Sequence, residues 1–367
     1  MPLNIVICCD GTNNQFSGYH TNVIRMFKIA VKNDSQVAFY DPGVGTMPVP
    51  WATSRLSKWW SMMEGLAFGV GFLDNIADAY CYLMEAYEPE ARVYIFGFSR
   101  GAYTARALAG MLHSVGLLNH GSESLVSYAL DYWQKDFGPE TPGGRVCAEF
   151  KATLARPCPV HFVGVWDTVG SVGFINQFKT FPHTARNPSV THVRHAISID
   201  ERRKCFRQNI MMPARPGQDV KNVWFAGVHC DVGGGYKPEE SGLSQVAFAW
   251  MAREARTAGL LIDDAALQTE LSAGSAPNPA GPVHVSLKSW WWLVELVPDR
   301  RYSFQDQKYH WHFFNFAQPR YFVGKGAPPR TRVHASVLQR MEKDTKYGSA
   351  NLAKDAAALR LLCDVEE

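Results

Sequence analysis

The chain has 367 residues, of which 46% are hydrophobic, and its formal net charge is +3. This hydrophobic fraction supports a substantial core, and so small a charge without an arginine–lysine run argues against a nucleic-acid partner. The amino terminus lacks a Sec-type signal, and no apolar run reaches the roughly 20 residues of a membrane-spanning helix. We therefore expect a cytoplasmic protein, with export by a secretion system that reads no such signal still open.

Strands and helices alternate in the amino-terminal part of the sequence. The predicted elements are a strand over 3–9, a helix over 22–32, a strand over 37–40 and a helix over 66–87. This order predicts an α/β fold of the α/β-hydrolase type, with a mainly parallel central sheet and helices on both faces. In such a sheet ligands gather at the carboxyl ends of the strands. The first strand ends there in the polar loop Asp10-Gly11-Thr12.

The stretch from residue 92 to residue 110 carries the strongest signal. The β-branched and aromatic residues over 92–98 predict a buried strand, and the alanine-rich segment after Ser99 favours a helix. Between them lies a G-x-S-x-G sequence, in which Gly97 and Gly101 flank Ser99. Glycines at these positions let the strand and helix backbones approach closely around a sharp turn. The context therefore predicts a nucleophile elbow that presents the Ser99 hydroxyl.

Two later predicted strands also end in polar groups. The strand over 159–166 is followed by Asp167, and the strand over 223–228 by His229. The carboxyl ends of parallel strands share one edge, so these side chains can converge on Ser99 although they are far apart in sequence. The chain order serine, acid, histidine is that of an α/β-hydrolase. We expect Ser99 to be the nucleophile, His229 the general base and Asp167 the carboxylate that orients the base.

Each of these assignments has an alternative. Asp167 could be a helix cap or a turn residue, and His229 could position the glycine-rich loop that follows it. His334 is the main alternative base, because the histidine of such folds usually lies nearer the carboxyl terminus, and His195 is a weaker one. Asp10 is more often a loop-stabilising carboxylate than a catalyst.

The oxyanion formed during acyl transfer needs N–H donors. We expect one from Arg100, at the amino end of the helix after Ser99, and one from Gly11 or Thr12. No cofactor and no metal are expected. The glycine run 233–235 lacks the Lys-Ser/Thr ending of a P-loop, and the acidic residues show no metal-ligand spacing.

Three segments leave the β/α rhythm and are expected to form a cap over the active edge: about 46–64, 117–158 and 260–325. The expected organisation is one α/β-hydrolase domain over 1–340 and a C-terminal helical tail over 341–367. Four tryptophans in the cap segments are expected to pack under the cap as core, where they could line an apolar channel to the serine: Trp59, Trp60, Trp290 and Trp291. If they are exposed, the same segments would form a peripheral membrane contact.

Several motifs together resemble one family. They lie at residues 9–14, 42–46, 96–103, 164–170, 195–203 and 229–236. In this order they resemble the bacterial and fungal α/β-hydrolase family of unknown function that includes the catalytic domains of type VI secretion phospholipase effectors. The resemblance runs from about residue 3 to residue 340. It implies an α/β-hydrolase fold and phospholipase A-type ester hydrolysis, with Ser99 as the serine, Asp167 as the acid and His229 as the histidine.

The sequence therefore predicts a serine hydrolase that cleaves carboxylic esters, with a lipid-like substrate of the lipase or phospholipase type. One alternative is a catalytically silent binding module that has the same fold, because a fold alone does not establish a function. Another is a thioesterase or peptidase on this fold. The sequence does not indicate an oligomeric state.

Overall fold

A computed structural model of the chain describes residues 2–11, 19–43, 71–169, 180–288, 291–296, 298–303, 308–312, 317–320, 331–344, 346–348 and 351–367. Its centre is an eight-stranded sheet with the order β12-β11-β8-β7-β6-β3-β1-β2. The strands are β1 (Asn4–Cys9), β2 (Gln36–Asp41), β3 (Arg92–Phe98), β6 (Val160–Trp166), β7 (Val190–Ser198), β8 (Asp219–Phe225), β11 (Arg332–His334) and β12 (Asp364–Glu366). All neighbouring pairs are parallel, which confirms the predicted fold class.

The direction of chain progression across the sheet reverses at β1. The strand β2 lies on one side of β1, whereas β3 lies on the other and later strands follow beyond it. At such a switch point the connections leave toward opposite faces, and in open α/β sheets ligands bind beside the carboxyl ends of the two strands that flank it. Asp10 follows β1 there, and Ser99 follows β3.

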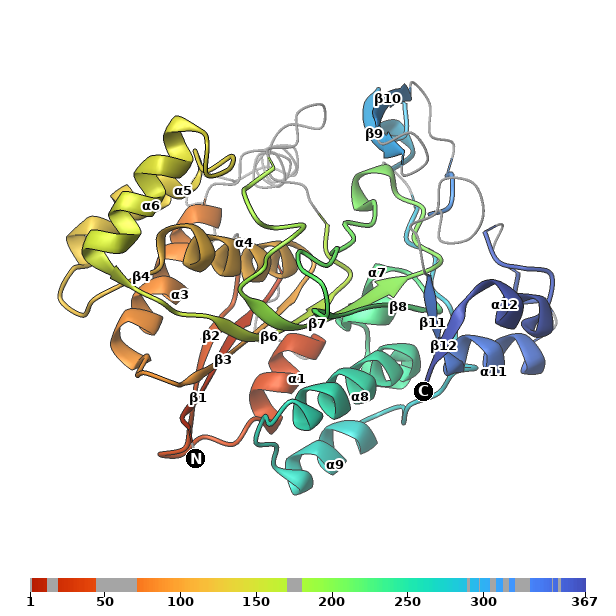
Figure 1. Cartoon of the computed structure of the whole chain (residues 1–367). Helices are drawn as coiled ribbons and strands as arrows, with labels where there is room; N and C mark the ends of the chain where they lie inside the picture. Colours follow the sequence, from red (N-terminus) through yellow and green to blue (C-terminus); the bar gives the residue numbers. More distant parts are fainter. Residues whose placement is uncertain are drawn as a thin grey trace, which may run out of the picture.

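Helices cover both faces of the sheet, because side chains along each buried strand alternate between two cores. In β1, Ile5 and Ile7 join one core, whereas Val6 and Cys8 join the other. The first core is covered by α3 (Phe72–Ala86) and α4 (Arg100–Val115), and the second by α1 (Asn22–Ile29), α8 (Gly242–Thr257) and α9 (Asp264–Ser272). Figure 1 shows these two helical layers on opposite sides of the sheet.

The segment 117–158 packs against the first helical layer. It contains η1 (Glu123–Leu125), α5 (Val126–Trp133) and α6 (Pro142–Leu154), and its ends are joined by the short antiparallel pair β4 (Leu117–Leu118) and β5 (Ala155–Arg156). Both α5 and α6 contact α4, and the Trp133 ring stacks on Phe181 with 5.1 Å between centroids. The role of the segment 117–158 as a cap over the active edge stays a prediction.

The other two expected cap segments are described only in part. Residues 46–64 lie outside the described residues. The segment 260–325 contains α9, α10 (Trp291–Val294) and an antiparallel hairpin of β9 (Asp299–Ser303) and β10 (Lys308–His312). Figure 1 shows this hairpin apart from the central sheet. Within the described ranges, no helix combines the length and the apolar character needed to cross a membrane.

The last part of the chain completes the sheet. Residues 341–367, expected to be helical, contain the end of α11 (Ala335–Lys343) and α12 (Ala356–Leu362), but they also contain the edge strand β12. The two helices contribute Val337, Leu338 and Leu359 to a third core against β7 and β8. The strand was not predicted because its three residues, Asp364-Val365-Glu366, lack an apolar run. Acidic side chains suit an exposed edge, where they discourage pairing with other chains.

A close approach of α4 to β1 generates the first prediction. A Cβ atom on Gly101 would lie 2.2 Å from the Cys9 carbonyl oxygen and 2.4 Å from that of Asp10. Both atoms belong to the main chain, which cannot move aside cheaply. We expect Gly101→Ala to lower the free energy of unfolding by about 1–3 kcal/mol, measured by urea denaturation.

Gly348→Ala is the matched control, because among the described residues no atom outside its chain neighbours lies within 4 Å of a Cβ built there. Its free energy of unfolding should stay within about 0.5 kcal/mol of the wild-type value. Equal stability of Gly101→Ala and the control would contradict the close contact between helix and strand.

Candidate active site

Ser99 lies in a strained turn between β3 and α4. Its φ is 59° and its ψ is −121°, a conformation that residues with a side chain rarely adopt. A Cβ atom on Gly97 would lie 2.4 Å from the Gly101 carbonyl oxygen, so strand and helix backbones meet where both residues lack side chains. The main chain therefore makes the sharp strand-to-helix turn that a nucleophile elbow requires.

Asp167 lies beside this turn because β3 and β6 are neighbours. Phe98 pairs with Trp166, and the Ser99 N–H donates to the Trp166 carbonyl oxygen over 3.1 Å. Asp167 is the next residue, and its own N–H donates to the carbonyl oxygen of Ala196 in β7 over 2.7 Å. The sheet register thus brings two of the three predicted catalytic residues to one edge.

His229 reaches the same place from the other side. It is the first residue of the short helix α7 (His229–Gly233), which begins after β8. Its Nδ1 lies 2.6 Å from Asp167 Oδ2, and both side chains are buried. The imidazole also packs on the Phe98 ring, with 4.6 Å between centroids. Since Phe98 precedes Ser99, this contact holds the imidazole next to the strained turn.

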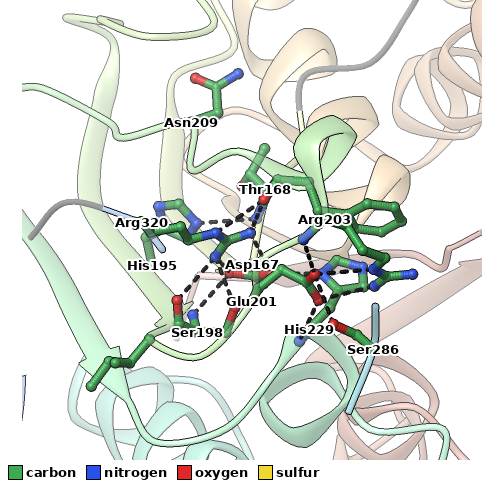
Figure 2. Close-up of polar contacts among 12 residues, drawn as sticks. Asp167, Thr168, His195, Ser198, Glu201, Arg203, Asn209, His229, Ser286 and Arg320 are labelled. Atoms are coloured by element: carbon green, nitrogen blue, oxygen red, sulfur yellow. Dashed lines mark hydrogen bonds and ion pairs between the residues drawn. The ribbon is translucent and has the colours of Figure 1, made fainter. Parts of the chain in front are cut away.

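The carboxylate of Asp167 is held by several donors besides His229. Arg320 makes a two-pronged ion pair with it, at 2.5 Å from Nη1 to Oδ1 and 3.1 Å from Nη2 to Oδ2, and the Ser198 N–H donates to Oδ1 over 2.9 Å. Figure 2 shows these groups around Asp167. Burial opposes the charged form, but the Arg320 guanidinium and the hydrogen bond to His229 outweigh it and hold the pKa of Asp167 well below its usual range.

Arg320 is itself fixed by the surrounding main chain. Its Nη1 donates to the Ser198 carbonyl oxygen over 3.1 Å, and its Nε donates to the Phe206 carbonyl oxygen over 3.0 Å. The side chain has no exposed surface. A buried guanidinium with all these partners has a single orientation, so it fixes the plane of the Asp167 carboxylate as well.

A second buried carboxylate, Glu201, supports His229 from its main-chain side. Its Oε2 accepts from the His229 N–H over 3.2 Å, and its Oε1 accepts from Ser286 Oγ over 2.9 Å. Burial raises the pKa of Glu201, but the neighbouring Arg203 guanidinium outweighs that effect and lowers it. Glu201 is therefore ionised at neutral pH and holds the first turn of α7 in place.

Burial lowers the pKa of His229, although the charge of Asp167 and the hydrogen bond to it act in the opposite direction. The imidazole is therefore neutral at pH 7. With Nδ1 bonded to Asp167, Nε2 is the nitrogen left to accept a proton. This is the protonation state that a general base needs.

The structure does not bring His334 to Ser99. β11 is the fourth strand from β3, about 19 Å away at the usual strand spacing. His334 stacks on Phe225, and its Nδ1 accepts from the Ser336 N–H over 3.2 Å at the start of α11. It serves as a helix cap.

His195 lies in β7 close to Asp167, but both of its nitrogens have partners. Nε2 accepts from the Thr168 N–H over 3.1 Å, and Nδ1 lies 3.3 Å from Asn222 Oδ1. Burial and the nearby Arg106 lower the pKa of His195 to about 3. Its contacts are those of a core histidine.

The Gly11 N–H is already used within its own loop. It donates to Asp10 Oδ1 over 2.7 Å, while Asp10 Oδ2 accepts from the Thr21 and Tyr40 hydroxyls over 2.6 and 2.8 Å. Asp10 therefore stabilises the loop, and the oxyanion role of Gly11 stays a prediction. Thr12 lies outside the described residues. Arg100 is the first residue of α4, and an oxyanion donor from its N–H stays a prediction.

Only one of the four predicted lining tryptophans is described. Trp59, Trp60 and Trp290 lie outside the described residues. Trp291 is partly buried and meets the Phe206 ring edge-on at 5.4 Å, whereas its neighbour Trp292 is 50% exposed. Since Phe206 also contacts the His229 ring at 4.8 Å, Trp291 is one ring away from the candidate base.

The two charged side chains that hold Asp167 and His229 in place, Arg320 and Glu201, were not predicted. Glu201 lies in the motif at residues 195–203, which contributed only to the family resemblance. The one feature that could have indicated its role is an acidic side chain next to two arginines. Arg320 lies in an aromatic segment without a local pattern, and its pairing with Asp167 spans 153 positions. Among the described residues, no group of three or more His, Cys, Asp or Glu side chains could hold a metal ion.

Comparison with known proteins places the chain in a family. A family model described as the catalytic domain of Tle1-like phospholipase effectors of the type VI secretion system (T6SS) matches residues 3–254. The chain belongs to this family. The match confirms the resemblance that the motifs indicated, and its residue range includes the strands β1 to β8 together with Ser99, Asp167 and His229.

Individual relatives are similar over part of their length. The uncharacterized protein YEL023C of Saccharomyces cerevisiae is 36% identical over 225 residues, which are 57% of this chain and 33% of the yeast protein. A crystal structure of an uncharacterized Pseudomonas aeruginosa protein is 19% identical, with a TM-score of 0.45 over 75% of this chain and 49% of that chain. The Tle1 effector bound to the VgrG spike of the type 6 secretion system is 20% identical, with a TM-score of 0.37 over 66% of this chain and 52% of that chain.

The Asp167–Arg320 pair generates the second prediction. Arg320→Met leaves a buried carboxylate without its main counter-charge, so the free energy of unfolding at pH 7 should fall by about 3–5 kcal/mol. The pKa of Asp167 is lower in the folded protein than in the unfolded chain. The ionised carboxylate therefore stabilises the fold fully above the pKa of the unfolded chain, and this stabilisation is lost as the pH falls through the pKa of the folded protein. The difference in free energy of unfolding between Arg320→Met and wild type should therefore become smaller in acid. Urea denaturation across pH measures both effects.

Arg360→Met is the control. It removes an ion pair to Glu342 of 3.1 Å in which both side chains are 55% exposed, and such a pair contributes about 0–1 kcal/mol. An Arg320→Met protein as stable as this control at pH 7 would show that the buried pair does not support the fold.

Proposed function

We propose that the protein is a serine ester hydrolase that cleaves lipid-like carboxylic esters of the phospholipase type. The observation that carries this proposal is the buried 2.6 Å contact between His229 Nδ1 and Asp167 Oδ2, beside the strained turn that holds Ser99. An imidazole oriented by a carboxylate next to a strained serine is the arrangement that activates a hydroxyl. Membership of the Tle1-like phospholipase family supports a lipid esterase activity.

In the proposed reaction, Ser99 Oγ attacks the acyl carbonyl carbon while its proton passes to His229 Nε2. The new imidazolium is stabilised by Asp167, whose charge is maintained by Arg320. The oxyanion is met by N–H groups at the start of α4. Collapse breaks the bond to the leaving alcohol, which takes the proton from His229 and leaves an acyl-enzyme. Water then attacks the acyl-enzyme, gives a proton to His229 and releases the acid as Ser99 recovers its hydrogen.

A catalytically silent binding module is the alternative, together with a thioesterase or peptidase on the same fold. A binding module needs neither a serine in a strained conformation nor a buried carboxylate that orients a histidine, and both features lower the stability of the fold. The family favours an oxygen ester over a thioester or an amide. Export as a T6SS effector and binding to a VgrG spike are proposals only, because the chain spans about half the length of the solved effector that it matches.

The proposed roles of Ser99 and His229, with His334 as the alternative base, generate the third prediction. Ser99→Ala and His229→Ala should each lower kcat by about 10³–10⁶-fold, because the catalytic residues act as a unit. His334→Ala should lower it by less than about tenfold, because that side chain caps a helix far from Ser99. Turnover is measured on a panel of short-chain esters, long-chain esters and phospholipids, with circular dichroism to check folding.

Two outcomes would contradict the proposal. If a folded Ser99→Ala protein hydrolyses its best ester at the wild-type rate, Ser99 is not the nucleophile. If the wild-type protein turns over no member of the ester panel but binds lipid, the chain is a binding module. A greater loss in His334→Ala than in His229→Ala would transfer the base to His334.

A further inference from the structure

Arg203 is a charged residue next to His229 that the proposed reaction does not use. It precedes the short helix η2 (Lys204–Phe206) and belongs to the motif Asp200-Glu201-Arg202-Arg203. Its guanidinium is bound edge-on by Glu201, with 3.0 Å from Nε to Oε1 and 3.0 Å from Nη2 to Oε2. The Phe206 ring lies against the guanidinium, at 3.6 Å from the ring centroid, and the Trp291 ring lies at 4.9 Å. These contacts fix the side chain before any ligand arrives.

The guanidinium lies beside the candidate base. Glu201 Oε2 accepts from Arg203 Nη2 and also from the His229 N–H. The Phe206 ring that covers Arg203 also meets the His229 ring, with 4.8 Å between centroids. One carboxylate oxygen and one ring therefore connect Arg203 to His229, and Figure 2 shows the two side chains next to each other.

Arg203 keeps donors for a ligand. A guanidinium has five N–H groups, and the Glu201 contact uses those on one edge. None of the described residues accepts a hydrogen bond from Nη1, and the side chain is 13% exposed. The carboxylate of Glu201 is shared with the His229 N–H and Ser286 Oγ, so it does not serve Arg203 alone. A fixed guanidinium with an unused edge binds a phosphate through two parallel hydrogen bonds.

We propose that Arg203 binds a phosphate group of the ester substrate and so selects phosphate-bearing acyl esters over neutral ones. This inference rests on the proposed function, and it assigns to Arg203 a role in specificity rather than in proton transfer. The fixed side chain lowers the entropy cost of binding the anion. The apolar rings of Phe206 and Trp291 beside it exclude water and suit the glycerol and acyl parts of the same substrate.

The test compares two soluble esters with the same acyl chains, dihexanoyl phosphatidylglycerol and dihexanoylglycerol, of which only the first carries a phosphate. Arg203→Lys keeps the charge and loses the planar fork. The double variant Glu201→Gln/Arg203→Gln removes both charges, so no buried carboxylate is left without its partner. We expect kcat/KM for the phosphate-bearing ester to fall about tenfold in Arg203→Lys and about 10–100-fold in the double variant, mainly through KM. In Arg203→Lys the neutral ester should lose less than about threefold. The double variant also changes the support that Glu201 gives to His229, so its readout is the ratio of the two esters rather than the neutral-ester rate.

Arg186→Gln is the matched control, because Arg186 is exposed and lies in the connection before β7; it should leave the ratio of the two esters unchanged. Equal losses on both esters, or no loss on either, would overturn the inference. A neutral-ester KM that responds to added inorganic phosphate only when Arg203 is present, with no change in ester preference, would show a site for free phosphate and would also overturn it.

A binding experiment distinguishes a failure of the proposed function from a failure of the inference about Arg203. Calorimetric binding of dihexanoyl phosphatidylglycerol to the Ser99→Ala protein needs no turnover. If wild type hydrolyses neither ester, the proposed function fails. In that case, weaker binding after the Arg203 changes supports the phosphate site, and unchanged binding overturns it.

Discussion

One negative charge lies at the centre of the site. The Asp167 carboxylate is 1% exposed, and a buried charge of this kind is stable only when donors and a counter-charge surround it. Arg320 supplies the counter-charge, Ser198 an N–H, and His229 a ring nitrogen. These groups come from a late loop, from the end of β7 and from α7. The carboxylate therefore joins distant parts of the chain, and the orientation of His229 depends on all of them.

This dependence explains why the site needs more of the chain than the family match covers. The match ends at residue 254, whereas Arg320 lies beyond it. The strands β11 and β12 and the helices between them also lie beyond it, and they extend the same parallel sheet past β8. The core at that edge includes Trp224 and Ile197 from inside the match together with Val333 and Leu359 from outside it. The structural unit is thus continuous across residue 254.

Features set by local sequence were predictable. The strands β1, β3 and β6 are buried on both faces, so their sequences are short, nearly continuous apolar runs. Such runs are typical of parallel strands and predicted them. Gly97 and Gly101 indicate the steric needs of the turn at Ser99, because a Cβ atom at either position would meet main-chain atoms. The edge at which Asp167 and His229 lie follows from strand direction alone. The functional roles of these residues stay predictions, although their placement supports them.

Features set by long-range contacts were not predictable. Arg320 shows no local pattern, and one sequence does not reveal a partner 153 positions away. The Gly11 N–H turns into its own loop because Thr21 and Tyr40 hold Asp10 in position, which residue spacing does not show. The role of Glu201 depends on where α7 begins relative to the end of β7. In each case the missing information is a side-chain orientation fixed by tertiary packing.

The central claim is that the Ser99 hydroxyl is activated by the buried His229–Asp167 pair. Reaction with a fluorophosphonate probe tests it most directly, because the probe phosphonylates activated serines and needs no knowledge of the natural substrate. Intact-protein mass spectrometry and peptide mapping should find one adduct, on Ser99, formed rapidly in the wild-type protein and lost in Ser99→Ala. A folded wild-type protein with no adduct, or with its adduct on another serine, would contradict the account.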